Sequence, residues 1–133
     1  MLPVLPFIPP SFPPGISCPS NILMHKDAQE ELQDIIKQNP AAKGQLKTKL
    51  NQRLSYLSQN LGQETKHTEW FEHLEDASYK SMRFANVKLV NNLRILYGIA
   101  NEKAYLLVAF TERNSGDYKR ALRVAENRAK GVL

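Results

Sequence analysis

The chain has 133 residues, enough for one small domain with a modest core, and it carries a formal net charge of +5 at pH 7. Residues 1–78 hold 7 Lys/Arg against 9 Asp/Glu, a balance of −2, whereas residues 79–133 hold 11 against 4, a balance of +7. Such a cationic half is typical of proteins that bind nucleic acid, although a basic surface without a specific ligand stays open. Cys18 is the only cysteine, which excludes an intramolecular disulfide and favours a reducing, cytoplasmic location.

The N-terminal stretch is rich in proline. Residues 1–24 contain seven of the eight prolines and no Lys, Arg, Asp or Glu. Proline at this density interrupts the continuous apolar helix that a secretory signal or a membrane span requires. We therefore expect residues 1–23 to be an extended or disordered leader and residues 24–133 to form a single domain. For this leader, the role of a plain linker is favoured over that of a proline-rich ligand for a partner domain. Translation that begins at Met24 in the native protein is a further alternative.

Two amphipathic helices follow the leader. Apolar residues recur from His25 at spacings of three and four, with acidic residues in the first turn where the helix dipole favours them: Ala28, Leu32, Ile35 and Ile36, with Asp27, Glu30 and Glu31. Asn39-Pro40 ends this helix and starts another, whose apolar stripe stops at Gly62: Leu46, Leu50, Leu54, Leu57 and Leu61. Two such helices joined by a tight turn predict an α-hairpin that covers an apolar surface.

Residues 63–77 are polar apart from Trp70, Phe71 and Leu74, which we expect to anchor a loop to the core. This stretch holds several residue types that bind metals: His67, Glu69, Glu72, His73, Glu75 and Asp76. The cluster lacks cysteine partners and a His-Glu-x-x-His frame, so solvated charges are favoured over a metal site. We predict no metal and no cofactor.

Strands and a final helix complete the chain. Alternating apolar residues predict two strands joined by a short turn at residues 100–103: Leu93, Ile95, Tyr97 and Ile99, then Leu106, Val108 and Phe110. A helix from about Asp117 has an apolar inner stripe and a basic outer side: Tyr118, Ala121, Leu122 and Ala125 inside, with Lys119, Arg120, Arg123 and Arg128 outside. The predicted fold is α+β, in which an N-terminal α-hairpin packs on a small twisted antiparallel sheet of three or four strands with a C-terminal helix.

Four motifs in the basic half resemble the RelE/ParE toxin superfamily, in particular its HigB-like, phage-derived branch. They are Tyr79-x-x-x-Arg83-Phe84, Asn92-x-Arg94-Ile95-x-Tyr97, an apolar strand ending in Ala109-Phe110, and Arg113 followed five residues later by Tyr118. The resemblance covers about residues 24–130 and implies a RelE-like fold for this domain.

The resemblance implies the toxin of a bacterial type II toxin–antitoxin pair. Many members are metal-independent endoribonucleases that cut messenger RNA on the ribosome and arrest translation, whereas the ParE branch poisons DNA gyrase. A gyrase poison or a catalytically inactive binding relative is therefore the alternative. An acidic antitoxin protein is the expected partner, together with messenger RNA on the ribosome and without a membrane.

The resemblance also assigns roles to individual residues. Arg94 corresponds to the strand arginine that holds the scissile phosphate, and Arg113 to a cation that stabilises charge or assists the leaving group. Tyr118 corresponds to an aromatic residue that stacks a base or takes part in proton transfer. Arg83 and Lys80 correspond to a basic pair, one of which serves as base or electrostatic helper.

Further substrate contacts are expected from the basic side of the last helix: Lys119, Arg120 and Arg123. A purely structural role is the alternative for Tyr118 and Arg113. Tyr118 would then be a core residue, and Arg113 would cap a strand or pair with Glu112 or Asp117. Met82 stands where some relatives carry a second strand cation, and the basic half contains no histidine, so the general base is open. The enzyme interpretation predicts that Arg94, Arg113 and Tyr118 converge on one open face.

Overall fold

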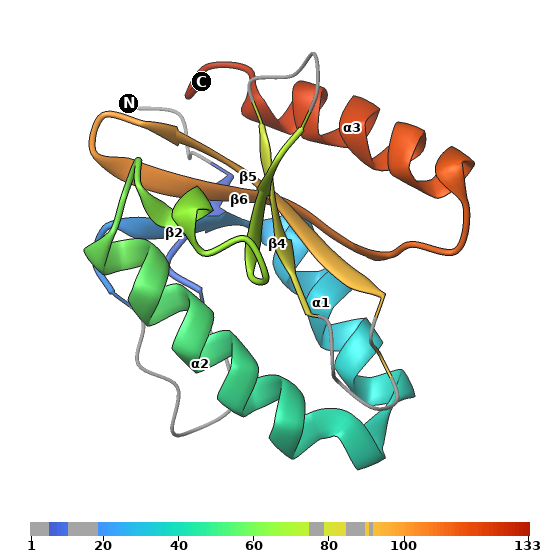
Figure 1. Ribbon diagram of the computed structural model, residues 1–133. Coiled ribbons are helices and arrows are strands. Elements are labelled where there is room, and N and C mark those ends of the chain that lie inside the picture. Colours follow the sequence, from blue (N-terminus) through green and yellow to red (C-terminus); the bar gives the residue numbers. More distant parts are fainter. Residues whose placement is uncertain (1–5, 11–18, 75–78, 85–89, 91) are drawn as a thin grey trace.

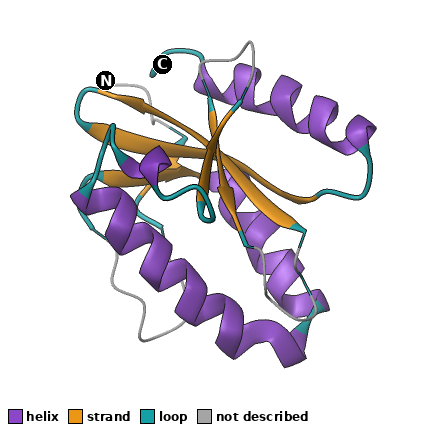
Figure 2. Ribbon diagram, in the orientation of Figure 1, coloured by secondary structure: helices purple, strands orange, loops and turns teal. Residues whose placement is uncertain are grey.

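The computed structural model describes residues 6–10, 19–74, 79–84, 90 and 92–133. In this part of the chain, six strands form one mixed sheet in the order β1-β2-β6-β5-β4-β3 (Figures 1 and 2). The strands are β1 Phe7–Ile8, β2 Ile22–His25, β3 Phe71–His73, β4 Lys80–Arg83, β5 Leu93–Ala100 and β6 Lys103–Thr111. The helices are α1 Lys26–Gln38, α2 Lys43–Gln59 and α3 Ser115–Ala129, with short 3₁₀ helices η1 Pro40–Ala42 and η2 Glu64–Lys66.

The predicted fold, an N-terminal α-hairpin on an antiparallel sheet of three or four strands, is wrong. Two strands precede the first helix, and β2 runs parallel to β6, with Ile22 opposite Ala104 and Met24 opposite Leu106. Phe7 and Ile8 then pair with β2 from its other side. Because the apolar run of β2 is short and its partner lies some eighty residues later, no local periodicity indicates this strand.

The helices α1 and α2 form where the apolar spacing predicts them, and both cover one face of the sheet (Figure 1). The N-terminus of α1 is capped by His25, whose Nδ1 accepts a hydrogen bond of 3.1 Å from the Asp27 amide. Their apolar stripes pack on inward-facing strand residues in the larger core, which includes Leu32, Leu46, Leu50, Leu54, Phe71, Met82, Ile95 and Tyr97. We call this side of the sheet the α1/α2 face.

The opposite side of the sheet, which we call the α3 face, is covered by α3 (Figure 1). The buried residues of α3 are all alanines: Ala121, Ala125 and Ala129. They pack on strand residues that include Leu96, Tyr105 and Leu107. Small side chains let the helix axis lie close to the sheet, so this core is thinner than the first.

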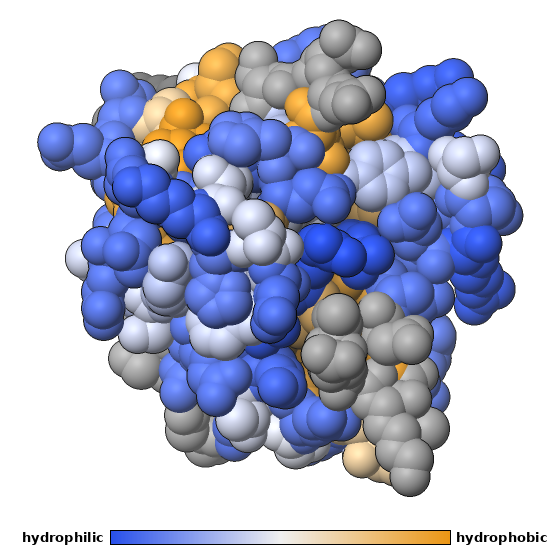
Figure 3. Space-filling model, viewed as in Figure 1, coloured by the Kyte–Doolittle hydropathy of each residue, from blue (hydrophilic) through white to orange (hydrophobic). Residues whose placement is uncertain are grey.

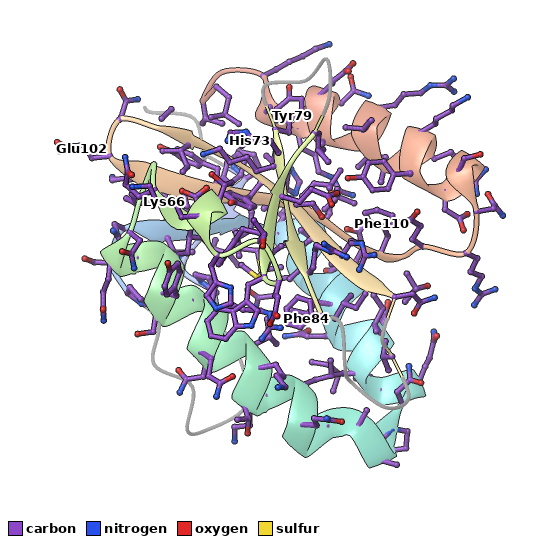
Figure 4. All side chains as sticks on the ribbon, in the orientation of Figure 1. Lys66, His73, Tyr79, Phe84, Glu102 and Phe110 are labelled. Atoms are coloured by element: carbon purple, nitrogen blue, oxygen red, sulfur yellow. The ribbon has the colours of Figure 1, made fainter. Side chains whose placement is uncertain are left out.

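The short turn predicted at residues 100–103 joins β5 to β6, with two residues between the strands. Asn101 and Glu102 both adopt left-handed backbone conformations, with φ of 53° and 62°. Two positive φ values match a type I′ hairpin turn, whose twist suits antiparallel strands. Figure 4 labels Glu102 at the tip of this hairpin.

Hydrophilic side chains cover the outer surface of α2 in the view of Figure 3. Among the helices that the structure describes, none is both long and apolar enough to cross a membrane.

Candidate functional site

Strand alternation gathers polar side chains on the α3 face. In β4 and β5, Arg83 lies opposite Arg94 and Ser81 opposite Leu96, while Glu72 of β3 lies opposite Ser81. Because successive residues of a strand point to opposite sides, these side chains face α3 while their neighbours enter the larger core. Glu112, just after β6, and Tyr118 of α3 join them. We call the whole group the polar cluster: Glu72, Ser81, Arg83, Arg94, Glu112 and Tyr118.

Tyr118 enters the cluster from the first turn of α3. Its ring packs edge-on against Phe110, with 5.7 Å between ring centroids, and Figure 4 shows Phe110 on the side of the sheet that faces α3. Burial raises the pKa of the Tyr118 hydroxyl, and the charge of Glu72 adds to this effect. The hydroxyl is therefore protonated at neutral pH, a state that suits donation of a hydrogen bond or proton rather than the role of a base.

The two arginines of the cluster are held loosely by carboxylates. Arg94 Nε lies 3.5 Å from Glu112 Oε2, and Arg83 Nη1 lies 3.6 Å from Glu72 Oε2. Both separations exceed the ~2.7–2.9 Å of a guanidinium–carboxylate hydrogen bond. The side chains of Arg83 and Arg94 are 32% and 17% exposed. Their N–H groups therefore remain available to an anion that displaces a carboxylate.

Three buried polar atoms of the cluster make no hydrogen bond of ordinary geometry with any described residue: Ser81 Oγ, Arg83 Nε and Tyr118 Oη. Across the described residues, no other buried side-chain nitrogen or oxygen is left in this state. Each such group costs about 1–3 kcal/mol of stability. Their concentration on one face indicates a site built to meet a polar ligand rather than to stabilise the fold.

Glu112 is fixed at the end of β6 by its backbone. Its N–H donates to the Asn92 carbonyl at 3.0 Å, and Asn92 Nδ2 donates to the Glu112 carbonyl at 2.9 Å. The sequence indicates Glu112 only as an ion-pair partner of Arg113, whereas in the structure it pairs with Arg94. This backbone support holds a carboxylate beside Arg94, and the charge of that carboxylate also acts on the Tyr118 hydroxyl.

Arg113, which the enzyme interpretation places with Arg94 and Tyr118, lies at a different location. Its side chain is exposed, and its backbone N–H donates to Asp117 Oδ2 at 2.9 Å. It lines a pocket of about 210 Å³ beside the C-terminal end of α1, with Ile35, Gln38, Asn39, Val90, Asn92 and Thr111. The structure therefore brings Arg94, Arg83 and Tyr118 together and places Arg113 at the pocket beside α1.

The other cations predicted to bind substrate also separate. Lys80 points to the α1/α2 face, where its Nζ forms a 2.9 Å ion pair with the fully buried Glu64. Lys119, Arg120 and Arg123 are exposed along α3, and Arg120 pairs with Asp117. Arg128, which the sequence places on the outside of this helix, instead turns inward.

Arg128 and Glu31 close the open edge of β6. Arg128 donates to both Glu31 oxygens, at 2.8 and 2.9 Å, and to the Leu107 carbonyl at 2.9 Å. Glu31 in turn accepts the Ala109 N–H at 3.2 Å. Because β2 pairs with β6 only as far as Leu106, this side-chain pair supplies the hydrogen bonds that a further strand residue would provide.

The residues of types that bind metals, between His67 and Asp76, do not form a metal site in the part of the chain that the structure describes. There, no group of three or more His, Cys, Asp or Glu is arranged to hold a metal ion. Glu72 belongs to the polar cluster, His73 Nε2 lies 3.2 Å from Thr65 Oγ1, and His67 stacks on Trp70. Glu75 and Asp76, like Cys18, lie outside the described residues.

Sequence reasoning missed Glu72 and Ser81 as members of the cluster. The strand that carries Glu72 has three residues, too few to display alternation, and Ser81 is recognisable only once the register of β4 is known. No protein-family model, curated protein or solved structure matches this chain. The function is therefore argued from the geometry of the polar cluster.

Proposed function

We propose that this protein is the toxin of a type II toxin–antitoxin pair and acts as a metal-independent, ribosome-dependent endoribonuclease. The observation that carries the proposal is the polar cluster, in which two arginines, a protonated tyrosine and a fixed carboxylate lie on one face. The +7 balance of residues 79–133 and the resemblance of their motifs to RelE/ParE toxins support the same function.

Cleavage of RNA without a metal needs three contributions. A base removes the proton of the ribose 2′-hydroxyl, cations stabilise the charge that gathers on the phosphate, and a donor serves the departing 5′-oxygen. Arg83 and Arg94 suit the second role, because neighbouring guanidinium groups hold phosphate oxygens. The phosphate would displace Glu72, whose side chain is 44% exposed, from its loose ion pair with Arg83.

Glu112 and Tyr118 supply the remaining two roles in this proposal. Glu112 takes the 2′-hydroxyl proton, since it is the carboxylate fixed by the backbone hydrogen bonds to Asn92. Tyr118 donates to the 5′-oxygen, consistent with the raised pKa of its buried hydroxyl. The attack of the 2′-oxygen then forms a 2′,3′-cyclic phosphate on one fragment and leaves a 5′-hydroxyl on the other.

The surroundings of the cluster fit a long polyanionic substrate. Arg113 and Lys119 follow Glu112 and Tyr118 directly in the chain, and with Arg123 of α3 these exposed cations would contact the backbone of RNA on the ribosome. An acidic antitoxin would compete for the same charges. Action on translated messages places the protein in the cytoplasm, in agreement with the solitary Cys18.

The second candidate is a binding protein without catalysis, either a gyrase poison or an inactive relative. The observation that favours it is the position of Arg113, whose side chain lines the pocket beside α1 rather than joining the polar cluster. In this candidate the loose ion pairs of Arg83 and Arg94 persist, and the basic surface only docks on a partner.

Mapping of 5′ ends in cellular messenger RNA after brief induction tests the proposal. The unaltered chain should produce new ends within translated regions and arrest growth, while Arg94→Gln should remove both. Lys37→Gln is the matched control, because it removes one positive charge from an exposed position on α1 and should leave cleavage intact. Circular dichroism verifies that both variants fold.

Two results would contradict the proposal. Growth arrest with intact messages would favour the gyrase poison, and persistence of the new ends in Arg94→Gln would separate cleavage from the polar cluster.

A further inference from the structure

An aromatic stack lies at the β3 edge of the sheet, apart from the polar cluster. The ring of His67 stacks on Trp70 with 4.0 Å between centroids and an interplanar angle of 14°. Tyr56 of α2 meets both rings edge-on, at 5.2 Å from His67 and 5.7 Å from Trp70. All three residues are partly exposed. Such a cluster presents aromatic faces to solvent.

The three distances show that one face of His67 is free of its aromatic neighbours. Were Tyr56 on the side of His67 opposite Trp70, its centroid would lie far beyond 5.7 Å from Trp70. Tyr56 therefore lies beside the stack rather than on top of it. Among these described rings, none covers the face of His67 that points away from Trp70, and a further flat ring can extend the stack there.

His67 and Tyr56 also line a surface pocket. The pocket has a volume of about 390 Å³ and is lined by Tyr56, Lys66, His67, Thr68 and Glu69. Its size falls within the ~300–1,000 Å³ that is typical of small-ligand sites. Lys66, at the end of η2 (Figure 4), supplies a positive charge, Thr68 supplies a hydroxyl and Glu69 supplies a carboxylate. An aromatic face beside a cation suits a nucleobase and its phosphate.

The stack is held rigidly from below. Arg53, 2% exposed, places its guanidinium 4.8 Å from the centroid of Trp70 and 4.9 Å from that of Phe84. Its Nε donates to the Arg83 carbonyl at 2.6 Å. The backbone N–H of Trp70 donates to the backbone carbonyl of His67 at 3.1 Å. These contacts fix Trp70, on which the His67 ring stacks, before any ligand arrives, which lowers the entropic cost of binding.

Arg83 of the polar cluster also contacts the segment that carries the pocket. The backbone N–H of Arg83 donates to the Trp70 carbonyl at 2.7 Å, and its Nη1 reaches the Thr68 carbonyl at 3.5 Å. Thr68 also lines the pocket. One extended strand of nucleic acid can therefore contact both Arg83 and His67.

We propose that His67 and Lys66 form a nucleobase-stacking subsite for single-stranded RNA, at the edge of the sheet next to Arg83. A base stacks on the free face of His67, and Lys66 contacts the adjoining phosphate. The choice of RNA as ligand rests on the proposed function. Stacking tolerates every base, so the subsite contributes affinity and position on the RNA rather than strong sequence preference.

Trp70 is the only tryptophan of the chain and lies directly against His67, so its fluorescence reports on the subsite. Titration of the full chain with single-stranded hexa-adenylate RNA should change this fluorescence. His67→Ala should weaken binding at least about tenfold, and His67→Phe should restore it, because a phenyl ring keeps the stacking face. His73→Ala is the matched control: it removes an exposed histidine from β3 and should leave the affinity unchanged.

Lys66→Gln keeps the test decisive if His67→Ala fails to fold, and should lower the salt dependence of binding by about one phosphate contact. The proposal is overturned if the unaltered chain shows no fluorescence change, if His67→Phe binds as weakly as His67→Ala, or if Lys66→Gln keeps both affinity and salt dependence. A retained fluorescence change in a chain that cuts no cellular message supports the subsite while rejecting the endoribonuclease.

Discussion

The two faces of the sheet treat their polar groups differently. On the α1/α2 face, the buried Glu64 carboxylate accepts hydrogen bonds from the Tyr97 hydroxyl at 2.7 Å and from Lys80 Nζ at 2.9 Å. The buried Arg53 likewise donates to the carbonyls of Arg83 and Lys49. On the α3 face, the hydroxyls of Ser81 and Tyr118 lie near each other, but neither makes a hydrogen bond of ordinary geometry with a described residue.

This contrast separates the interactions that stabilise the fold from those that we connect with function. Buried polar groups are ordinarily satisfied, and the α1/α2 face follows that rule. The α3 face departs from it at positions where two arginines and two carboxylates also gather. Local departures from the rules of stable folding are expected at functional sites. We therefore assign stability to the first face and ligand binding to the second.

Replacement of Glu64 should give the largest loss of stability. Glu64→Ala leaves the largely buried Lys80 ammonium without its partner and removes the acceptor of the Tyr97 hydroxyl. Loss of one member of a buried pair typically costs about 3–5 kcal/mol. Urea unfolding should show a decrease of this size in the free energy of unfolding. A decrease below about 1 kcal/mol would mean that this face does not depend on its buried pair.

The Glu64 carboxyl group should also make the free energy of unfolding depend on pH. Burial alone would raise the pKa of Glu64, but the hydrogen bonds from Tyr97 and Lys80 outweigh it and hold the pKa below its ordinary value. The stabilisation is therefore complete above the ordinary carboxyl pKa and is lost as pH falls through the lower folded value. Unfolding free energies at about pH 6 and pH 3 should differ less in Glu64→Gln than in the unaltered chain. An equal difference in both proteins would assign the acid sensitivity to other carboxyls.

The pair that links the two faces should show a smaller effect. Glu31 of α1 and Arg128 of α3 form a bidentate pair whose side chains are 33% and 16% exposed. Solvent screening limits such a pair to about 1 kcal/mol. A double-mutant cycle with Glu31→Ala and Arg128→Ala should return a coupling free energy of this size from urea unfolding. Exactly additive single effects would leave α1 and α3 uncoupled at the edge of β6.

The sequence predicts local elements better than distant pairings. The helices α1 and α2 follow from apolar spacing that ends at Asn39-Pro40 and Gly62, and the hairpin at Asn101 follows from its polar turn. The strand β2 could not be predicted, because its stability comes from β6 and from Phe7 and Ile8 of the proline-rich stretch. Pairing across such distances has no local signal.

Part of the candidate site also follows from simple strand geometry. Arg94 stands out as a cation among apolar strand residues, and it does lie in the polar cluster. Lys80 and Arg83 are three residues apart in one strand, so the period of two places them on opposite faces. Applied to the sequence, that rule separates them. Glu72 could not be found, since only the pairing of β3 with β4 brings it beside Arg83.

The central claim is tested most directly by removing one tyrosine hydroxyl from each face and measuring unfolding and RNA cleavage together. Tyr97→Phe should lose about 1.5–3 kcal/mol of unfolding free energy, because it removes a hydrogen bond to a buried carboxylate, and the folded variant should still cut messenger RNA. Tyr118→Phe should lose no stability and can gain up to about 1–3 kcal/mol, because it removes a buried hydroxyl that makes no hydrogen bond of ordinary geometry, yet it should abolish cleavage. Equal losses of stability in the two variants, or undiminished cleavage by Tyr118→Phe, would contradict the assignment of stability to the α1/α2 face and of ligand binding to the α3 face.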